Sequence, residues 1–288
     1  MSRYSISDNP PISRKNTTAL LLINNQLGFR DISAWGTGAS TPDYDKNISA
    51  LISLFRDICA KSPEGEGPLM IHVQYRPVWT DHPLHVSKTG PFGANGEEQR
   101  AIDFLEFAAP QVFRDGAKTL IYSLDETASS RPAPTQPPDE IIMTCHGHSV
   151  FINTPLETIL KNRGIKTLLI AGMGTDLAVS TAVRTAQNLA LTGKWGGRGN
   201  MEDVAASERW TDGAGVYAGE EDKLVVDMPR IILIQDATRA FGKGGVDAQT
   251  VHHVHIESLR GFSEVRDTAG VIEAMTGGFE YANIDLLH

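Results

Sequence analysis

Short, continuous runs of apolar residues recur along the chain and are the main indication of its fold. Each run has the length of a β-strand, and polar residues do not alternate with apolar ones inside it. This pattern is typical of strands that helices cover on both faces of a sheet. The runs span Thr18–Asn24, Leu69–Val73, Ile141–Cys145, Thr167–Ala171 and Arg230–Gln235. They predict a mostly parallel sheet.

Between the runs, apolar residues recur at helical spacing and predict packed helices. One series is Ile48, Leu51, Ile52, Phe55 and Ile58, and another is Leu177, Val183, Ala186 and Leu189. A further helix is marked at both ends, by Thr154 and Glu157 as a capping box and by Gly164 as its terminator. A predicted strand follows within two residues. Strands and helices that alternate in this way predict a doubly wound, Rossmann-like α/β fold.

The chain has 288 residues, which suits a single α/β domain over residues 1–288. Two segments interrupt the rhythm of strands and helices. Residues 127–138 (TASSRPAPTQPP) form a Pro-rich connector, and residues 193–229 form an insertion longer than most loops of such folds. The insertion carries Trp195 and Trp210 among glycines. It is interpreted as a lid, an oligomer contact in which these tryptophans are buried between chains, or an irregular loop.

Charge and cysteine content narrow the class of protein. Against 35 acidic residues the chain has 26 basic ones, a net charge of -9, without a run of Lys or Arg, so we expect no nucleic-acid partner. A small molecule or a protein is the expected partner. Two cysteines do not make a disulfide framework, and no stretch reaches the ~18 to 20 apolar residues of a membrane span. Residues 1–16 lack the apolar region of a signal peptide, which predicts a cytoplasmic protein.

Four stretches of local sequence together resemble one protein family. Residues 149–186 (SVFINTPLETILKNRGIKTLLIAGMGTDLAVSTAVRTA) and residues 18–29 (TALLLINNQLGF) carry most of the likeness, and residues 71–73 and 252–275 agree in order and spacing. They are similar to the isochorismatase-like cysteine hydrolases. The resemblance implies the isochorismatase-like hydrolase fold and a homodimer or homotetramer. We expect no cofactor.

The same resemblance implies that the usual catalytic residues are missing. The positions of the family's catalytic Asp, Lys and Cys are occupied by Asn24, Cys145 and Ala178. Alanine is not a nucleophile, and asparagine is not a general base at neutral pH. Hydrolysis through a thioester at Ala178 is therefore excluded if the alignment holds. The family's main-chain oxyanion hole falls on the N–H groups of Gly174 and Ala178, which do not depend on side chains.

Other polar residues near these positions are candidates for binding a substrate. Cys145 is interpreted either as a relocated nucleophile or as a small buried filler at a strand end. Asn24 offers hydrogen bonds without ionising. The remaining substrate-binding candidates are Asn25, Gln26, Trp79, His146, His148, Thr175 and Asp176. We expect His252, His253 and His255 to be exposed or at an interface.

A second cluster after the Leu69–Val73 run raises the question of a metal. Asp81, His82 and His85 are similar to the residues with which nicotinamidases of this superfamily bind zinc, but Asp81 and His82 are adjacent, which departs from that spacing by one residue. Adjacent side chains on an extended chain point to opposite sides. We therefore expect no metal and interpret the segment as a polar loop at the rim of the pocket. GMGTDL at 172–177 is a poor dinucleotide motif, because Leu177 replaces the third glycine.

These observations favour a small-molecule metabolic enzyme that works without a thioester. Positioning and hydrogen bonding would drive an isomerisation, elimination, hydration or cyclisation. Two alternatives stay open. One is a catalytically silent pseudo-hydrolase that binds a ligand or a partner, and the other is a hydrolase with Cys145 as nucleophile or with a zinc site.

Overall fold

A single parallel sheet organises the protein. The computed structural model describes residues 10–85, 87–88, 100–111, 119–122, 139–192, 194–196 and 228–277. In it, seven strands lie in the order β3-β4-β2-β1-β5-β6-β7, and each neighbouring pair is parallel. The strands are β1 (Thr18–Ile23), β2 (Leu69–Tyr75), β3 (Thr119–Tyr122), β4 (Glu140–Cys145), β5 (Thr167–Met173), β6 (Arg230–Arg239) and β7 (Glu264–Arg266). The order reverses at β1, as in doubly wound folds.

Five of the strands coincide with the apolar runs, so those predictions are confirmed. Every residue of β1 and β5 is buried, because both strands have a neighbour on each side and helices on both faces. The short strand β7 lies within the segment at 252–275 that the family resemblance pointed to. The edge strand β3 was not predicted, since it is short and borders the Pro-rich segment.

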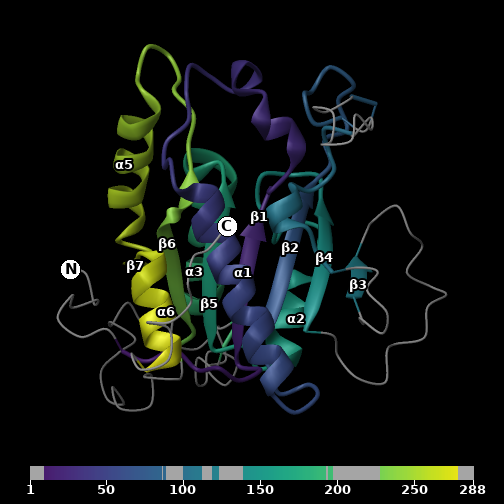
Figure 1. The fold of residues 1–288 in the computed structure, drawn as a ribbon, viewed down its shortest axis with the longest axis vertical. Coiled ribbons are helices and arrows are strands. Elements are labelled where there is room, and N and C mark those ends of the chain that lie inside the picture. Colours follow the sequence, from purple (N-terminus) through teal and green to yellow (C-terminus); the bar gives the residue numbers. More distant parts are fainter. Residues whose placement is uncertain are drawn as a thin grey trace, which may run out of the picture.

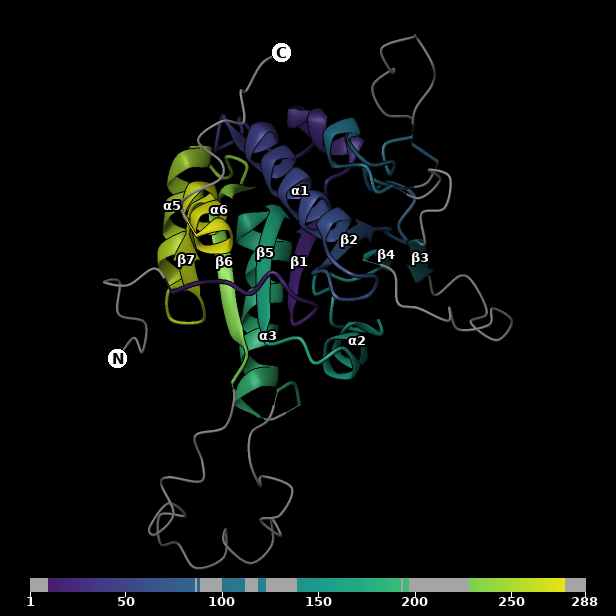
Figure 2. The same ribbon diagram turned by 60° about the horizontal axis from the view of Figure 1, so that its bottom comes forward.

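Helices cover both faces of the sheet (Figures 1 and 2). In Figure 2, α1 (Tyr44–Lys61) and α6 (Thr268–Thr276) lie on one side, and α2 (Leu156–Asn162) and α3 (Ser180–Leu191) lie on the other. Helix α5 (Ala248–Leu259) stands beside the β6–β7 edge. Single turns complete the fold: η1 (Leu27–Arg30), η2 (Ile32–Ala34), η3 (Glu106–Ala108) and η4 (Thr175–Val179). None of the helices in the described ranges has the length and apolar character needed to cross a membrane.

Most of the predicted helical stripes face the core. Ile48, Leu51 and Phe55 of α1 are fully buried, and Val183 of α3 is too. Leu177 is an exception, because it lies in η4 before α3 begins and 41% of it is exposed. The η4 turn has π-helical geometry, so its side chains do not continue the stripe of α3.

The capping prediction for α2 is confirmed at its C-terminal end and only in part at its start, where Pro155 precedes the first helical residue and Glu157 makes no capping bond among the described residues. The Thr154 Oγ1 atom accepts a hydrogen bond from the Leu156 N–H at 3.3 Å. At the other end, Gly164 has a left-handed φ of 61°. The N–H groups of Gly164 and Ile165 return to the last carbonyls of the helix, which is how a glycine terminator satisfies them.

Of the two predicted interruptions, only the edges of the insertion at 193–229 are described. The Pro-rich connector at 127–138 lies outside the described residues, as does Trp210. Trp195 is described, and only 1% of it is exposed. Its indole N–H donates to the Ile165 carbonyl at 3.0 Å. The expectation that Trp195 is buried between chains is therefore wrong: it packs inside its own chain, anchoring the start of the insertion to the α2–β5 turn.

Candidate active site

The three positions that correspond to the family's catalytic residues lie at one edge of the sheet. Asn24 directly follows β1, Cys145 is the last residue of β4, and Ala178 lies in η4 just after β5. All three are buried, with 6%, 3% and 5% of their surfaces exposed. These strands are not all neighbours, because β2 lies between β4 and β1. β4 is two strand spacings from β1 and three from β5, about 10 and 14 Å, so Cys145 lies closer to Asn24 than to the end of β5.

Asn24 has an unusual backbone and an unused side-chain oxygen. Its φ of 56° is left-handed, a conformation that asparagine tolerates better than most residues. Its N–H still donates to the Val73 carbonyl at 3.1 Å, so the chain leaves the β1 ladder only after this residue. Among the described residues, Asn24 Oδ1 is buried and has no hydrogen-bond partner. An unpaired buried acceptor costs about 1 to 3 kcal/mol, which marks this atom as a candidate ligand contact.

The Asn25 side chain is held by a residue of helix α1. The Tyr44 hydroxyl of α1 donates to Asn25 Oδ1 at 2.6 Å, whereas the buried Asn25 Nδ2 has no partner within the described part of the chain. Burial raises the pKa of the Tyr44 phenol far above its ordinary value, so this hydroxyl keeps its proton and remains a donor. Asn25 therefore has a fixed orientation.

Gln26 does not serve the role that was predicted for it. Its Oε1 accepts from the Tyr75 N–H at 2.9 Å, and its Nε2 donates to the carbonyls of Tyr75 and Ile102 at 2.9 and 3.0 Å. The side-chain amide thus stands where the next peptide group of β1 would be and extends the ladder with β2. With 0% of its surface exposed and three backbone partners, Gln26 is a structural residue rather than a substrate ligand.

Cys145 is buried as an uncharged thiol. Desolvation by burial raises its pKa to about 12. The thiolate is the nucleophilic form of cysteine, and at neutral pH it is essentially absent here. The structure therefore favours the interpretation of Cys145 as a small buried filler over that of a relocated nucleophile.

The predicted oxyanion hole is not formed in this conformation. The Gly174 N–H donates to the Arg239 carbonyl of β6 at 2.8 Å, so it is not available to a ligand. The Gly174 carbonyl accepts from the N–H groups of Leu177 and Val179, which closes the η4 turn around Ala178. Of the two main-chain donors that were expected, the Gly174 N–H is therefore occupied by another group of the chain.

Thr175 and Asp176 are engaged by other parts of the chain. Thr175 is fully buried, and its Oγ1 lies 3.2 Å from Nδ1 of His252 on α5. Asp176 forms an ion pair with Lys243 at 2.5 Å. His252 is itself buried, contrary to the expectation that it is exposed or at an interface. These contacts fix η4 from its outer side.

His146 offers the clearest acid-base group at this edge. Its Nδ1 lies 2.6 Å from the Arg76 carbonyl, and because a carbonyl only accepts hydrogen bonds, Nδ1 carries the proton. In the neutral ring, Nε2 is then the atom with the free lone pair. The residue is half-buried and directly follows β4. A fixed tautomer of this kind suits a general base or a hydrogen-bond acceptor.

Aromatic rings gather at the end of β2, which sequence reasoning did not foresee. The His82 and His148 rings lie 5.4 and 5.9 Å from the Tyr75 ring, and Trp35 lies 5.7 Å from His82. Trp35 stacks in turn on Phe29 at 4.2 Å. These residues come from four separate segments. The only signal in the sequence is that each follows or ends a predicted strand.

The loop after β2 does not form a metal site in the described residues. No group of three or more His, Cys, Asp or Glu side chains there is placed to hold a metal ion, and Asp81, His82 and His85 form no such group. The Nδ1 atoms of His82 and His85 accept hydrogen bonds from the N–H groups of Leu84 and Ser87. Trp79 is 66% exposed and lies on the surface of this loop.

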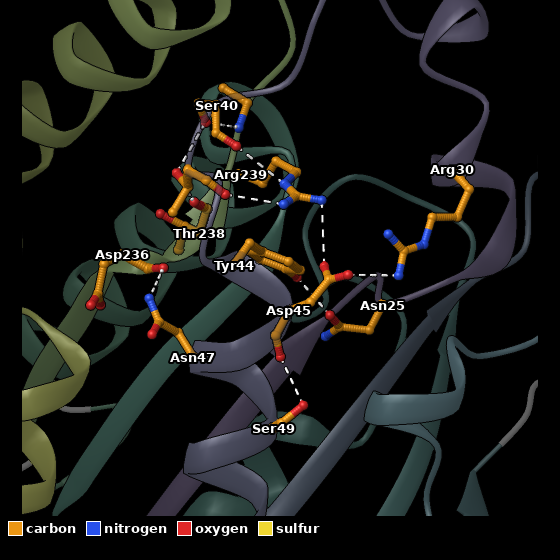
Figure 3. A network of polar contacts seen from close by, with 12 residues as sticks. Asn25, Arg30, Ser40, Tyr44, Asp45, Asn47, Ser49, Asp236, Thr238 and Arg239 are labelled. Atoms are coloured by element: carbon orange, nitrogen blue, oxygen red, sulfur yellow. Dashed lines mark hydrogen bonds and ion pairs between the residues drawn. The ribbon is translucent and has the colours of Figure 1, made fainter. Parts of the chain in front are cut away.

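A network around Arg239 ties the segment before α1 to the end of β6 (Figure 3). The Arg239 guanidinium donates to the carbonyls of Ser40 and Thr41 at 3.2 and 3.0 Å. It also lies over the Tyr44 ring, 4.5 Å from its centroid, and 3.5 Å from Asp45. Because the Tyr44 hydroxyl binds Asn25, this network also fixes the position of Asn25 in the candidate site from the α1 side.

Comparisons with known proteins agree with this architecture. The family model described as Isochorismatase domain matches residues 18–192. The ureidoacrylate amidohydrolase RutB of Methylorubrum extorquens is 31% identical over 179 residues, which are 59% of this chain and 63% of that protein. The RutB of Klebsiella pneumoniae is 26% identical over 160 residues, covering 56% and 60%. The match thus spans less than two thirds of either relative.

Solved structures show the same fold. A hydrolase of the isochorismatase family from Chromobacterium violaceum aligns with a TM-score of 0.55 and 19% identity, covering 94% of this chain and 96% of its own. A cysteine hydrolase from Pseudomonas syringae aligns with a TM-score of 0.55 and 18% identity, covering 93% and 96%. With the family match extending over more than half of the sequence, the chain belongs to the isochorismatase family.

Proposed function

We propose that this protein is a small-molecule enzyme that acts on an amide or carbonyl compound at the carboxyl ends of β1 and β5, without a thioester. The observation that carries the proposal is the buried Oδ1 of Asn24 at that edge, which has no hydrogen-bond partner among the residues that the structure describes. In its place the family resemblance implies a catalytic carboxylate. Asparagine retains a hydrogen-bond acceptor and adds a donor, so the position keeps its capacity to hold a polar substrate while it loses its charge.

The named relatives supply the substrate class. RutB is an amidohydrolase of ureidoacrylate, and amides and ureides present N–H groups that an orphan acceptor such as Asn24 Oδ1 would bind. Ala178 is not a nucleophile, and the Cys145 thiol, with its pKa raised to about 12 by burial, is uncharged. The proposed chemistry therefore involves no covalent bond between enzyme and substrate: it is hydration, elimination, isomerisation or cyclisation of a bound carbonyl compound.

His146 is the proposed proton acceptor. Its Nδ1–H is held by the Arg76 carbonyl, which leaves Nε2 as the lone-pair atom of the neutral ring. Removing a proton from water or from a carbon next to a carbonyl requires such a lone pair, and a correctly placed base contributes about 10² to 10⁴ in rate. Asn24 would orient the substrate, and His146 would move the proton.

A second candidate, a ligand-binding pseudo-hydrolase, is favoured by a different observation. The Gly174 N–H, the Gln26 amide and the Asp176 carboxylate all bind other groups of the chain. A site whose polar groups are turned to structural use binds ligands without stabilising a transition state.

Turnover of a defined probe separates the two. The wild-type protein is incubated with ureidoacrylate and a panel of small amides and ureides, and each compound is followed by proton NMR. We expect one class of probe to be consumed, and Asn24→Gly to slow its turnover by about 10² or more, the scale of losing one preorganised hydrogen bond. Glycine keeps the left-handed backbone, so this variant removes the amide without adding strain.

The matched control is Asn153→Gly. Asn153 also has a left-handed φ, of 57°, but is exposed and lies just before α2. Equal turnover in wild type and Asn24→Gly would refute the role of Asn24. A probe that binds but stays unchanged would establish the pseudo-hydrolase, and a covalent acyl adduct in the intact mass would contradict a reaction without a thioester.

A further inference from the structure

A cavity lies beside β6, apart from the site at the ends of β1 and β5. Its volume is about 230 Å³, equal to the share of about seven or eight waters in the liquid. Asn24, Cys145 and Ala178 do not line it. The residues that do come from β6, α5 and the segment before α1: Thr41, Gln235, Asp236, Gln249, His252, His253 and Ile256.

An irregularity in β6 places two of these side chains. Leu233 of β6 pairs with Ile170 of β5, but the next pairing joins Thr238 to Gly172, so β6 bulges between them. Gln235 and Asp236 lie in this bulge. The Asn47 side chain of α1 donates to the Asp236 carbonyl at 2.8 Å and holds the bulged backbone (Figure 3). Bulges are over-represented next to functional sites because they redirect side chains.

Asp236 gives the cavity a negative charge. Among the described residues that line the cavity, it is the only acidic one, and neither Lys nor Arg is present. One carboxylate oxygen, Oδ1, accepts hydrogen bonds from the Thr268 N–H and hydroxyl at 2.7 and 2.8 Å. Burial, with the nearby Asp267 adding to it, raises the pKa of Asp236. Since the described lining includes neither Lys nor Arg, a bound cation would stabilise this carboxylate.

Helix α5 contributes Gln249, His252, His253 and Ile256 to the lining. His252 is buried, and desolvation lowers its pKa to about 4, so its ring is neutral at physiological pH. Its Nδ1 is engaged with Thr175. The neutral ring and Ile256, one turn later on α5, line the cavity together. Thr41 also lines the cavity, and its left-handed φ of 56° is a rare conformation for a β-branched residue.

We propose that this cavity is a second ligand site, specific for a small organic cation such as a short primary alkylammonium, whose charge pairs with Asp236 and whose chain packs on His252 and Ile256. The pairing supplies what the described lining lacks, because this lining holds one carboxylate and neither Lys nor Arg. The volume admits a chain of about four carbons with its ammonium group.

The site is connected to η4 through one hydrogen bond. His252 forms the cavity wall with its ring and reaches Thr175 with its Nδ1, and Thr175 begins the turn that holds Ala178. A ligand that packs on the ring therefore stabilises the position of η4. Occupancy of the cavity should be detected at the edge where β1 and β5 end.

The experiment measures binding of n-butylammonium chloride to the full chain by NMR titration, with ionic strength held constant by NaCl. Butan-1-ol and butanoate serve as the neutral and anionic probes of similar length. We expect saturable binding of the ammonium alone, with shifts at His252 and Thr175. Equal binding of butan-1-ol would overturn the charge argument, and the absence of saturable ammonium binding would overturn the site.

Two variants test the assignment to this cavity. Asp236→Asn removes the charge and keeps an oxygen for Thr268, and it should weaken n-butylammonium binding tenfold or more. Because Asp236 is also a structural acceptor, Gln249→Lys provides a second test from an exposed position of α5: its ammonium should compete and abolish binding. Gln249→Met controls for size and Glu257→Gln for loss of a remote charge. Unchanged affinity in Gln249→Lys would refute the location.

Discussion

Replacing Gln26 is the sharpest test of how the site is built. In Gln26→Leu the side chain keeps its approximate size but loses its amide. The Tyr75 N–H and carbonyl then lose their partner while 92% of the Tyr75 surface remains buried, because only 8% is exposed. The Ile102 carbonyl keeps a donor, since Gln74 Nε2 reaches it at 2.9 Å.

The expected loss of stability follows from the Tyr75 N–H and carbonyl, which would be buried without a partner. Each buried, unpaired backbone group costs about 1 to 3 kcal/mol, so the free energy of unfolding should fall by about 4 kcal/mol. For a chain of this size about 2 to 4 °C corresponds to each kcal/mol, which gives a fall in Tm of about 8 to 16 °C. Urea unfolding followed by circular dichroism, together with calorimetry, measures both quantities.

Gln74→Leu is the matched control. It removes a hydrogen bond to the same Ile102 carbonyl, but there the Gln26 amide remains as a donor, so the loss should be about 1 kcal/mol. If Gln26→Leu is no more destabilising than Gln74→Leu, the idea that the Gln26 amide extends the β1–β2 ladder is refuted.

Three more outcomes are expected. Burial alone would raise the pKa of the Glu140 carboxyl, but His72 and Arg56 lower this pKa to about 2. Because the pKa in the folded state is below that in the unfolded state, the ionised carboxylate stabilises the fold above pH ~4.5, and this contribution is lost as the pH falls toward 2. Glu140→Gln should therefore flatten the pH dependence of urea unfolding in that range. Burial raises the pKa values of Cys59 and Cys145 to about 12, so a thiol reagent at pH 7 should label the folded protein at least ~100-fold more slowly than the urea-unfolded chain. Fast labelling of Cys145 would contradict its assignment as a buried filler. Trp195→Phe removes the donor to the Ile165 carbonyl and should cost about 1 to 3 kcal/mol without changing the mass measured by light scattering; a change of mass would return Trp195 to an interface.

The five apolar runs determined the fold by themselves. A strand such as Thr18–Ile23, buried along its whole length, needs neighbours on both sides and helices on both faces, and that requirement is written in consecutive residues. The spacing of Ile48, Leu51 and Phe55 likewise fixes which face of α1 is buried. Local patterns of this kind need no knowledge of distant contacts.

The sequence also identified the edge at which the candidate site lies, because Asn24 and Cys145 each come at the end of an apolar run. It did not determine what each polar side chain does there. Gln26, Thr175 and Asp176 were expected to bind a substrate, but their partners are Tyr75, His252 and Lys243, which lie far away in sequence.

Only the tertiary structure decided these roles, since a hydrogen bond depends on which distant atom arrives within about 3 Å. The same holds for Cys145, whose raised pKa comes from burial by residues of other segments, and for the cavity at Asp236, which needs the β6 bulge and α5 side by side. Apolar periodicity is a local property and can be recognised from the sequence alone. Polar partnership is a non-local property, because directional contacts are set by the packing that the apolar pattern brings about.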